Sequence, residues 1–323
     1  MPTYYHGVLP DKRDMLGSSA GTDSLKTHAW EGNMRPQRLR HPVTVTGSGI
    51  LGLGSEVTFR PTTSPGWMIS FLGDRPHAHP FPIDTWALRL GWRNICVNLK
   101  YPDSLTGKRT AYVVEHALAV REGLALYDGV CLEIGRHGIP FTGHSQSFVD
   151  AITPALEPSE VTPRCYTISR TISIKTADGL GSVEFQPSNS GDLILEISAD
   201  YSARGLGADS YTWHSGRNTL ADIANARGEL KPEYWKIVRA LEMIGWPHGD
   251  AFADLGMMDP TSWLSSLLHH RGIDTLGELG AVAPNGKLSG ICRIHRAGHR
   301  EAVPLVRMMT QNLVEVRELS RVA

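Results

Sequence analysis

The sequence pattern predicts a run of short strands followed by helices twice along this chain, and this repeated order constrains its fold more than any other feature. In the first half, β-branched and aromatic runs precede a segment of helical periodicity at 113–127. The predicted strands of this half cover residues 43–45, 57–59, 67–71, 94–99 and 130–134. A short helix at 146–152 closes the half, and this order predicts an α+β protein.

The second half begins again with strands. They are predicted at residues 166–174, 183–186, 193–198 and 289–295. Helices are predicted at 218–226, at 232–244 with proline in its first turn, around His270 and Asp274, and at 301–319. The repeated order predicts two similar layers of strands and helices.

A linker is predicted at 154–163, which holds three prolines and few apolar residues. It divides the chain into a first α+β domain at 37–158 and a second at 159–323. Residues 1–36 are polar and without periodicity, so we predict a flexible N-terminal arm there.

The composition is that of a globular protein with a hydrophobic core, because 41% of the 323 residues are hydrophobic and 20% are charged. A net charge of −1 provides no overall basic field for nucleic acid, although local basic patches can still bind a phosphate-bearing small molecule. No apolar stretch reaches the length of about 18 residues that a membrane-spanning helix requires, and the N-terminus lacks a signal-peptide profile.

The cysteines are far apart and form no CxxC pair. They are Cys96, Cys131, Cys165 and Cys292. This spacing disfavours a cysteine zinc site and a disulfide framework, and it predicts reduced thiols in a cytoplasmic protein.

Two further motifs have a functional and a structural interpretation. The glycine-rich run 47–54 lacks the GK[ST] ending of a phosphate-binding loop and leads to a strand, which favours a hairpin turn. His77 and His79 form an HxH pair that suggests a metal site, but the prolines around them favour a surface loop.

His270 and Asp274 are the strongest candidates for a metal site, because residues four apart lie on the same face of a helix. Imidazole nitrogen and carboxylate oxygen are ligands that zinc accepts. A catalytic zinc has three protein ligands and keeps one position open. The pair therefore requires a third ligand and a base near the open position.

His116 is the candidate for the third ligand, since it opens a helix after the turn-forming residues 102–107. Its neighbour Glu115 can stand beside the metal without binding it and deprotonate the attacking water, whose pKa zinc lowers toward about 7. Taken alone, a glutamate and a histidine at the start of a helix also fit a purely structural role.

His299 lies at the junction of a strand and a helix, where an imidazolium can stabilise an oxyanion or protonate a leaving amine. Glu278 follows Asp274 by four residues on the same helix face and can hold that imidazole in its charged form. By itself, His299 is equally compatible with a structural role.

The order and spacing of these residues resemble the UDP-3-O-acyl-N-acetylglucosamine deacetylase family, which are zinc enzymes of lipid A synthesis. Glu115-His116 resembles its TVEH motif and Gly298-His299 its KSGH motif. The HxxxD of 270–274, followed by Gly277-Glu278-Leu279, resembles its HKxLDxxGDL motif. Weaker likenesses at 47–61, 139–148 and 184–187 extend the resemblance over roughly residues 37–315.

The resemblance implies two similar α/β-sandwich domains with the active site between them. The implied zinc ligands are His116, His270 and Asp274. Glu115 would be the general base, and His299 the electrostatic stabiliser or general acid, with Glu278 where the family has an aspartate. Water would attack an amide carbonyl, and acetate and a free amine would leave.

Several positions depart from the family pattern. Arg271 and Arg296 replace two lysines but keep the positive charge, so both are candidates for binding a substrate phosphate or pyrophosphate. Gly228 stands where the family has an oxyanion-contacting threonine, and it is also assigned to the substrate site. The stretch at 245–258 is short and glycine-rich where the family has an insert that forms an acyl-chain tunnel.

We therefore expect a zinc-dependent deacetylase, an amidohydrolase that removes an acetyl or similar acyl group from an N-acylated amino sugar or nucleotide sugar such as UDP-N-acetylglucosamine. The departures favour a small-molecule substrate without a long acyl chain over the usual lipid A precursor. Two alternatives stay open. One is a catalytically altered homologue that binds a sugar nucleotide, and the other is a zinc hydrolase acting on another amide or a cyclic C–N bond in a specialised metabolite pathway.

Overall fold

Two five-stranded sheets with the same strand topology form the frame of the protein. The structure is a computed structural model. It describes residues 35–49, 53–71, 80–91, 97–101, 109–135, 137–140, 144–204, 207–229, 252–253 and 260–316.

The first sheet has the strand order β2-β3-β9-β4-β5. Its strands are β2 (Val43–Ser48), β3 (Gly54–Pro61), β4 (Trp67–Phe71), β5 (Phe81–Pro82) and β9 (Val130–Ile134). Neighbouring strands are antiparallel except β4 and β9, which are parallel. A parallel pair requires a long crossover connection, and here that connection contains a helix.

The second sheet repeats this arrangement with the order β12-β13-β19-β14-β15. Its strands are β12 (Ile172–Lys175), β13 (Ser182–Pro187), β14 (Leu193–Asp200), β15 (Ala208–His214) and β19 (Gly290–His295). In this sheet only β14 and β19 are parallel. β19, which comes last in the sequence, takes the central position, as β9 does in the first sheet. The two halves of the chain therefore share one topology.

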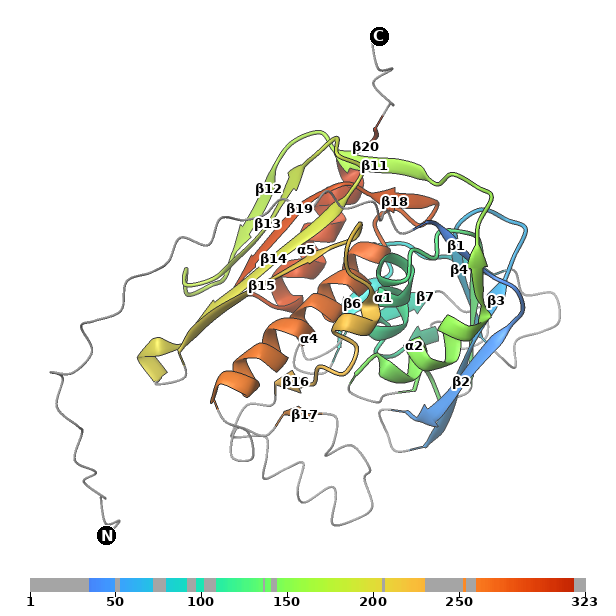
Figure 1. The fold of residues 1–323 in the computed structure, drawn as a ribbon, viewed down its shortest axis with the longest axis horizontal. Coiled ribbons are helices and arrows are strands. Elements are labelled where there is room, and N and C mark those ends of the chain that lie inside the picture. The colour runs from blue at the N-terminus through green and yellow to red at the C-terminus, as the bar shows by residue number, and fades with distance from the viewer. Residues whose placement is uncertain are drawn as a thin grey trace, which may run out of the picture. The chain divides into compact units, whose positions relative to one another are not determined.

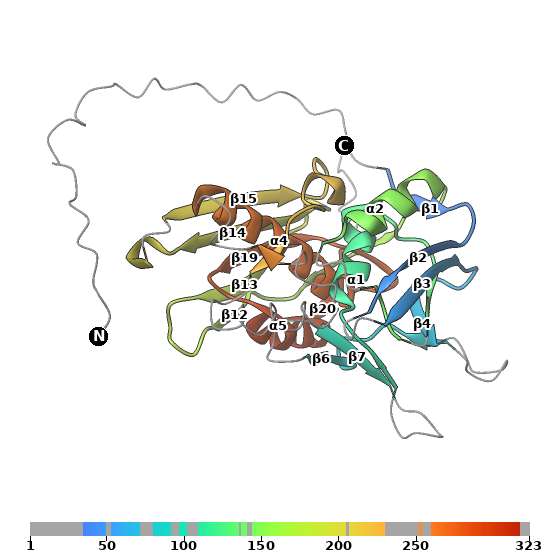
Figure 2. The same cartoon turned by 90° about the horizontal axis from the view of Figure 1, so that it is seen from below.

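Within the described ranges, four helices lie between the two sheets (Figures 1 and 2). They are α1 (Glu115–Gly123), α2 (Gln146–Ile152), α4 (Pro260–Gly280) and α5 (His299–Gln311). α2 packs on β2, whereas α4 packs on β14 and β15 and α5 on β12 and β13. Because α1 contacts both α2 and α4, the helices of the two halves meet in the middle of this unit.

Smaller sheets complete the fold. One joins β6 (Leu88–Leu90), β7 (Val97–Tyr101) and β8 (Arg109–Ala111), and another joins β11 (Arg164–Ile168), β18 (Gly286–Leu288) and β20 (Leu313–Glu315). Two strand pairs are β1 (Gln37–Leu39) with β10 (Leu156–Pro158), and β16 (Gly228–Glu229) with β17 (Phe252–Ala253). Single 3-10 turns occur at Thr153–Ala155, Ser202–Arg204 and Leu220–Asp222.

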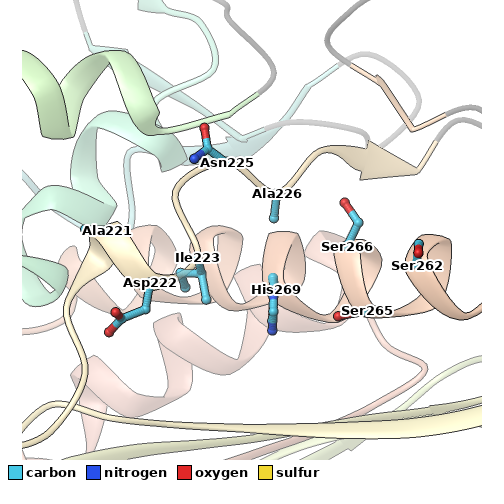
Figure 3. A pocket seen from close by; sticks show the side chains of 9 residues that line it. All are labelled: Ala221, Asp222, Ile223, Asn225, Ala226, Ser262, Ser265, Ser266 and His269. Atoms are coloured by element: carbon cyan, nitrogen blue, oxygen red, sulfur yellow. The ribbon is translucent and has the colours of Figure 1, made fainter. Parts of the chain in front are cut away.

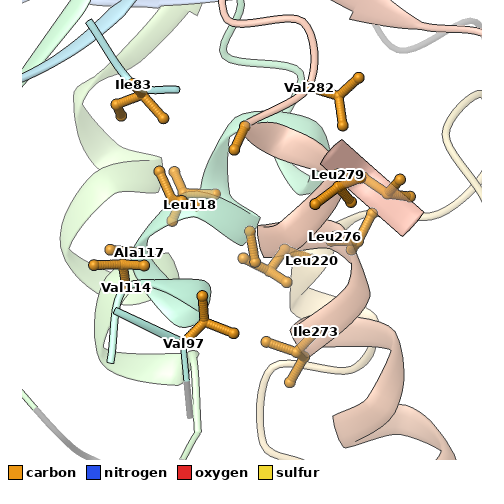
Figure 4. Packing of buried hydrophobic residues seen from close by; sticks show 14 of the residues in the cluster. Ile83, Val97, Val114, Ala117, Leu118, Leu220, Ile273, Leu276, Leu279 and Val282 are labelled. Atoms are coloured by element: carbon orange, nitrogen blue, oxygen red, sulfur yellow. The ribbon is translucent and has the colours of Figure 1, made fainter. Parts of the chain in front are cut away.

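The hydrophobic core runs through the contact between α1 and α4 without interruption. Leu118 of α1 and Leu276 and Leu279 of α4 are at most 1% exposed there, and Figure 4 shows these side chains converging. Glycines 277 and 280 of α4 face the backbone of α1 at Glu115 and Leu118, so the two helices approach closely. This contact unites residues 32–323 in one compact unit.

Many predicted elements are confirmed. The hairpin at 43–61, the strands at 67–71, 130–134, 183–186, 193–198 and 289–295, and the helices at 146–152 and around His270 and Asp274 are all present. The mixed α/β fold is therefore as expected, with helices layered on each large sheet. The separation into two domains at 158/159 is not confirmed, because residues 32–323 form one unit.

Several predicted boundaries were wrong. The linker at 154–163 contains a 3-10 turn and β10, whose backbone pairs with β1 near the start of the chain. The strand at 166–174 is interrupted between β11 and β12, which belong to different sheets. The helix at 113–127 is shorter, since α1 ends at Gly123 and Ala125 takes a φ of 52°.

Two further corrections concern the second half. The helix predicted at 218–226 is only the turn Leu220–Asp222, because the N–H of Thr219 donates to the Asp222 carboxylate and closes a capped turn. The last helix begins at His299 and ends at Gln311, and the apolar residues after it form β20 against β11. Strand β15 was not predicted, because its outer positions are polar and exposed.

Some predictions fall outside the described residues. They concern the arm up to residue 34, His77 and His79, Cys96, the helix at 232–244 and most of the stretch 245–258. Cys131, Cys165 and Cys292 are free thiols, as predicted. Within the described ranges, no helix combines the length and apolar character needed to cross a membrane.

Candidate metal centre

The start of α1 is held in a strained backbone conformation by β7. Val113 has a φ of 57°, a left-handed value that β-branched residues rarely adopt. Its N–H donates to the side-chain oxygen of Asn98 at 3.1 Å, and the N–H of Val114 donates to the carbonyl of Val97 at 2.9 Å. These bonds fix the direction in which the first turn of α1 presents Glu115.

α4 presents the other half of the site on one face. His270, Asp274 and Glu278 follow one another at intervals of one helical turn, and the face that carries them is turned toward α1. The close contact at Gly277 brings the first turn of α1 over this face. The fold thus places Glu115 next to residues that follow it by more than 150 positions in the sequence.

Two imidazole nitrogens and one carboxylate oxygen converge between the helices. Asp274 Oδ1 lies 3.4 Å from His270 Nε2 and 3.7 Å from His116 Nε2. A tetrahedral zinc with ligand bonds of about 2.0–2.2 Å holds its ligand atoms about 3.3–3.5 Å apart, so these distances are close to those of a zinc site. His270 and Asp274 therefore lie on one helix face as predicted, and His116 adds the third convergent ligand atom.

The surroundings of these atoms also fit a cation. Asp274 Oδ1 is buried, and no group that the structure describes gives it a hydrogen bond. A buried carboxylate oxygen without a partner is costly, and a metal ion would compensate it. The Ala226 carbonyl lies 3.3 Å from His270 Nδ1, which directs the N–H to that side of the ring and leaves Nε2 available for a metal.

The electrostatics match this assignment. Burial lowers the pKa of His270 to about 4, so the ring is neutral at neutral pH, as a metal ligand must be. Burial disfavours the Asp274 carboxylate, but the imidazoles of His270 and His299 hold its pKa below the usual range. Because His270 is neutral, the positive charges of His299 and Arg271 are the ones that keep Asp274 ionised.

His299 is the first residue of α5, and a buried carboxylate orients it. Its Nδ1–H donates to Glu278 Oε1 at 2.7 Å, while its Nε2 lies 3.5 Å from Asp274 Oδ2. Burial alone would lower the pKa of His299, but Asp274 and Glu278 outweigh it and raise the pKa to about 9. The ring is therefore an imidazolium at neutral pH, and its Nε2–H faces the site.

Glu115 stands beside the ligand atoms and is only 2% exposed. Its Oε2 accepts a hydrogen bond from the N–H of Val97 at 3.0 Å. Burial raises the pKa of Glu115 to about 7, against the opposing effect of the imidazoles of His299 and His116. A carboxylate with this pKa can accept and return a proton near neutral pH.

Glu115, Asp274 and His299 also lie close enough together to suggest a second metal group. However, His299 is protonated on both ring nitrogens when its pKa is about 9, so Nε2 has no lone pair for a metal. The arrangement is better described as a base and an acid beside one metal position.

The residues assigned to substrate binding are more dispersed. Arg271 donates to Asp274 Oδ2 at 3.2 Å and packs against Gly298, so it belongs to the rim of the centre. Arg296 lies over the ring of Tyr201, 5.3 Å from the centroid, and no described contact joins it to the ligand atoms. Gly228 pairs with Phe252 in the short sheet of β16 and β17.

Sequence reasoning missed Asn98 and His144, and it named Gly277 only as part of a motif. Asn98 fixes the strained Val113 and Gly277 permits the close helix approach, but neither role has a local signature. His144 precedes α2, and its pKa is lowered mainly by burial and further by its proximity to the His116 imidazole. Its position is set by the bond from the Ser145 N–H to the Ala224 carbonyl at 2.9 Å, which only the folded chain forms.

No protein-family model and no curated protein matches this chain.

Proposed function

We propose that this protein is a zinc-dependent amidohydrolase that removes an acetyl or similar acyl group from an N-acylated amino sugar or nucleotide sugar. One observation carries the proposal. Two imidazole nitrogens and Asp274 Oδ1 converge, and a buried glutamate of raised pKa and a protonated histidine lie beside them. A purely structural zinc site requires neither a base nor an acid beside it.

His116, His270 and Asp274 would hold the zinc ion. When bound, zinc polarises a carbonyl group and lowers the pKa of water toward about 7. Three protein ligands are the number typical of a catalytic site, because a fourth position stays open.

Glu115 acts as the general base. It accepts a proton from water while the water oxygen forms a bond to the amide carbon. Its hydrogen bond from the Val97 N–H uses one carboxylate oxygen and leaves the other for the proton.

His299 acts as the electrostatic stabiliser or general acid. Its Nε2–H stabilises the negative charge that develops on the carbonyl oxygen, or it protonates the nitrogen as the C–N bond breaks. Glu278 keeps the ring charged and fixes its orientation through Nδ1. The products are a carboxylate and a free amine.

The substrate class rests on the resemblance of three motifs to the UDP-3-O-acyl-N-acetylglucosamine deacetylase family. Arg271 at the rim of the centre keeps a positive charge within reach of an anionic substrate group. The substitutions at Gly228 and beyond favour a substrate that lacks a long 3-O-acyl chain.

The test is acetate release from UDP-N-acetylglucosamine and from its 3-O-acylated form by the zinc-loaded protein. We expect turnover that Glu115→Gln abolishes, whereas Glu184→Gln on the exposed face of the second sheet retains it. Full turnover by Glu115→Gln would contradict the base assignment. Faster turnover of the 3-O-acylated sugar would contradict the preference for a substrate without that chain, and sugar-nucleotide binding without turnover would favour a non-catalytic homologue.

A further inference from the structure

A cavity of about 530 Å³ lies between α4 and the turn that precedes β16. Its size falls within the range of about 300–1,000 Å³ that small-molecule sites occupy. Six polar residues line it, namely Asp222 and Asn225 from the turn and Ser262, Ser265, Ser266 and His269 from α4. Figure 3 shows the turn on one side and the helix residues on the other.

The helical spacing explains why these side chains share one wall. Residues 262, 265, 266 and 269 are three or four positions apart, which places them on one face of α4. The N–H of Arg227 donates to Ser266 Oγ at 3.1 Å and ties the end of the turn to this face. The cavity is therefore built by secondary structure on one side and a hydrogen-bonded turn on the other.

The cavity adjoins the candidate metal centre. Ser266 precedes His270 by four residues, which is about 6 Å along the helix axis. Ala226 lines the cavity, and its carbonyl is the group that lies 3.3 Å from His270 Nδ1. Ala226 and the face of α4 are therefore shared by the cavity and the surroundings of the metal ligand His270.

The residues that line the cavity determine which chemical group of a ligand it can bind. Three hydroxyls, an amide, an imidazole and a carboxylate offer both donors and acceptors. Among the lining residues that the structure describes there is no lysine or arginine, and Asp222 repels anions, so a phosphate is disfavoured. The aliphatic lining is limited to two alanines and Ile223, which is too little for a long acyl chain.

We propose that this cavity binds an uncharged, hydroxyl-rich ring, a second sugar unit linked to the N-acylated unit at the metal. Serine hydroxyls and the Asp222 carboxylate exchange hydrogen bonds with sugar hydroxyls. The inference rests on the proposed function for the position of the amide. It narrows the substrate to an N-acylated sugar that carries another sugar.

The first test compares two substrates that share one N-acetylglucosamine unit. One is N,N′-diacetylchitobiose, which carries a second sugar, and the other is hexyl N-acetylglucosaminide, which carries an alkyl chain. We expect kcat/KM of the wild type to be at least about tenfold higher for the disaccharide, a difference that one or two additional hydrogen bonds provide. A faster alkyl substrate would overturn the proposal.

Ser265→Leu places an aliphatic side chain in the cavity and should bring the ratio of the two kcat/KM values near one. Ser173→Leu, at an exposed position of β12, is the matched control and should keep the ratio. Asn225→Leu changes the opposite wall and serves where Ser265→Leu fails to fold. An unchanged ratio in both cavity variants would reject the proposal.

A second measurement is independent of turnover. Cellobiose has two sugar units and no amide, and its binding is followed by saturation-transfer NMR. We expect transfer with the wild type and with Ser173→Leu, and none with Ser265→Leu. Cellobiose binding without any amide hydrolysis would leave the cavity assignment intact and contradict the proposed function. Amide hydrolysis without cellobiose binding would contradict the cavity assignment and leave the proposed function intact.

Discussion

Gly277 of α4 lies directly against the backbone of Glu115, because a Cβ atom at position 277 would be 2.0 Å from the Glu115 carbonyl oxygen and 2.7 Å from its Cα. The position of the proposed base therefore depends on the absence of a side chain on the neighbouring helix. No side-chain rotation relieves a contact with backbone, so any other residue at 277 must move α1 or α4.

Gly277→Ala should therefore displace Glu115 from the ligand atoms. We expect kcat to fall by about 10²-fold, the effect of a displacement of roughly 1 Å at a reacting group. The matched control is Gly272→Ala on the same helix, where a Cβ would meet only the side-chain ends of Ile197 and Ile223 at 3.3 Å. Steady-state kinetics and thermal melting of both variants test this, and an unaltered kcat in Gly277→Ala would show that the contact does not position the base.

The ligand assignment predicts which variants lose zinc. His116→Ala, His270→Ala and Asp274→Ala should each lose the metal and the activity, because two remaining ligands hold zinc weakly. His299→Ala should keep about one zinc per chain while kcat falls by about 10²–10⁴-fold, the range for loss of a general acid. Elemental analysis of the purified variants measures this, and stoichiometric zinc in all three ligand variants would exclude the set.

The pH dependence of kcat/KM should be bell-shaped. Activity rises as Glu115 loses its proton, and bound zinc shifts this limb below the pKa of about 7 of the metal-free site, since a cation favours the carboxylate. Activity falls as the pH rises through the pKa of His299, because the imidazolium is the active form; this pKa is about 9 in the metal-free site, and bound zinc on Asp274 lowers it.

Glu278→Gln tests the origin of the alkaline limb. Removal of this negative charge lowers the pKa of His299, so the limb should move to lower pH. Glu184→Gln, which removes a carboxylate on the exposed sheet face, should leave the profile in place. Identical profiles for wild type and Glu278→Gln would show that the two residues do not interact functionally.

Arg121 should be the most sensitive position for stability outside the site. Its guanidinium is completely buried and pairs with Glu122. It donates to the carbonyl of Gly280 at the end of α4 and to those of Ala283 and Gly286 in the segment that follows. Arg121→Met leaves Glu122 without its charge partner and should lower the free energy of unfolding by about 3–5 kcal/mol.

Arg60→Met provides the comparison, because Arg60 pairs with Glu133 at the surface and such pairs contribute less than about 1 kcal/mol. Adding Glu122→Gln to Arg121→Met should restore part of the stability by removing the unpaired charge. Urea unfolding of the three variants measures these differences. Equal losses for Arg121→Met and Arg60→Met would contradict the role of burial.

The sequence by itself determined those features that depend on neighbours along the chain. The hairpin at 43–61 follows from β-branched residues around a glycine run, and the common face of His270, Asp274 and Glu278 follows from helical periodicity. Local pattern failed where tertiary contacts decided the outcome. The apolar residues after Gln311 continued the helical pattern, but pairing with β11 turned them into β20.

Only the tertiary structure decided how the candidate centre is assembled. Glu115 and His116 meet His270 and Asp274 because Gly277 lets two helices touch, and because β7 holds Val113 in a conformation that its side chain disfavours. The equal topology of the two sheets likewise became visible only from strand pairing. Contacts between residues far apart in the chain have no local signature. The residue types therefore indicated the chemistry, while the packing of α1 on α4 decided that Glu115, His116, His270 and Asp274 share one site.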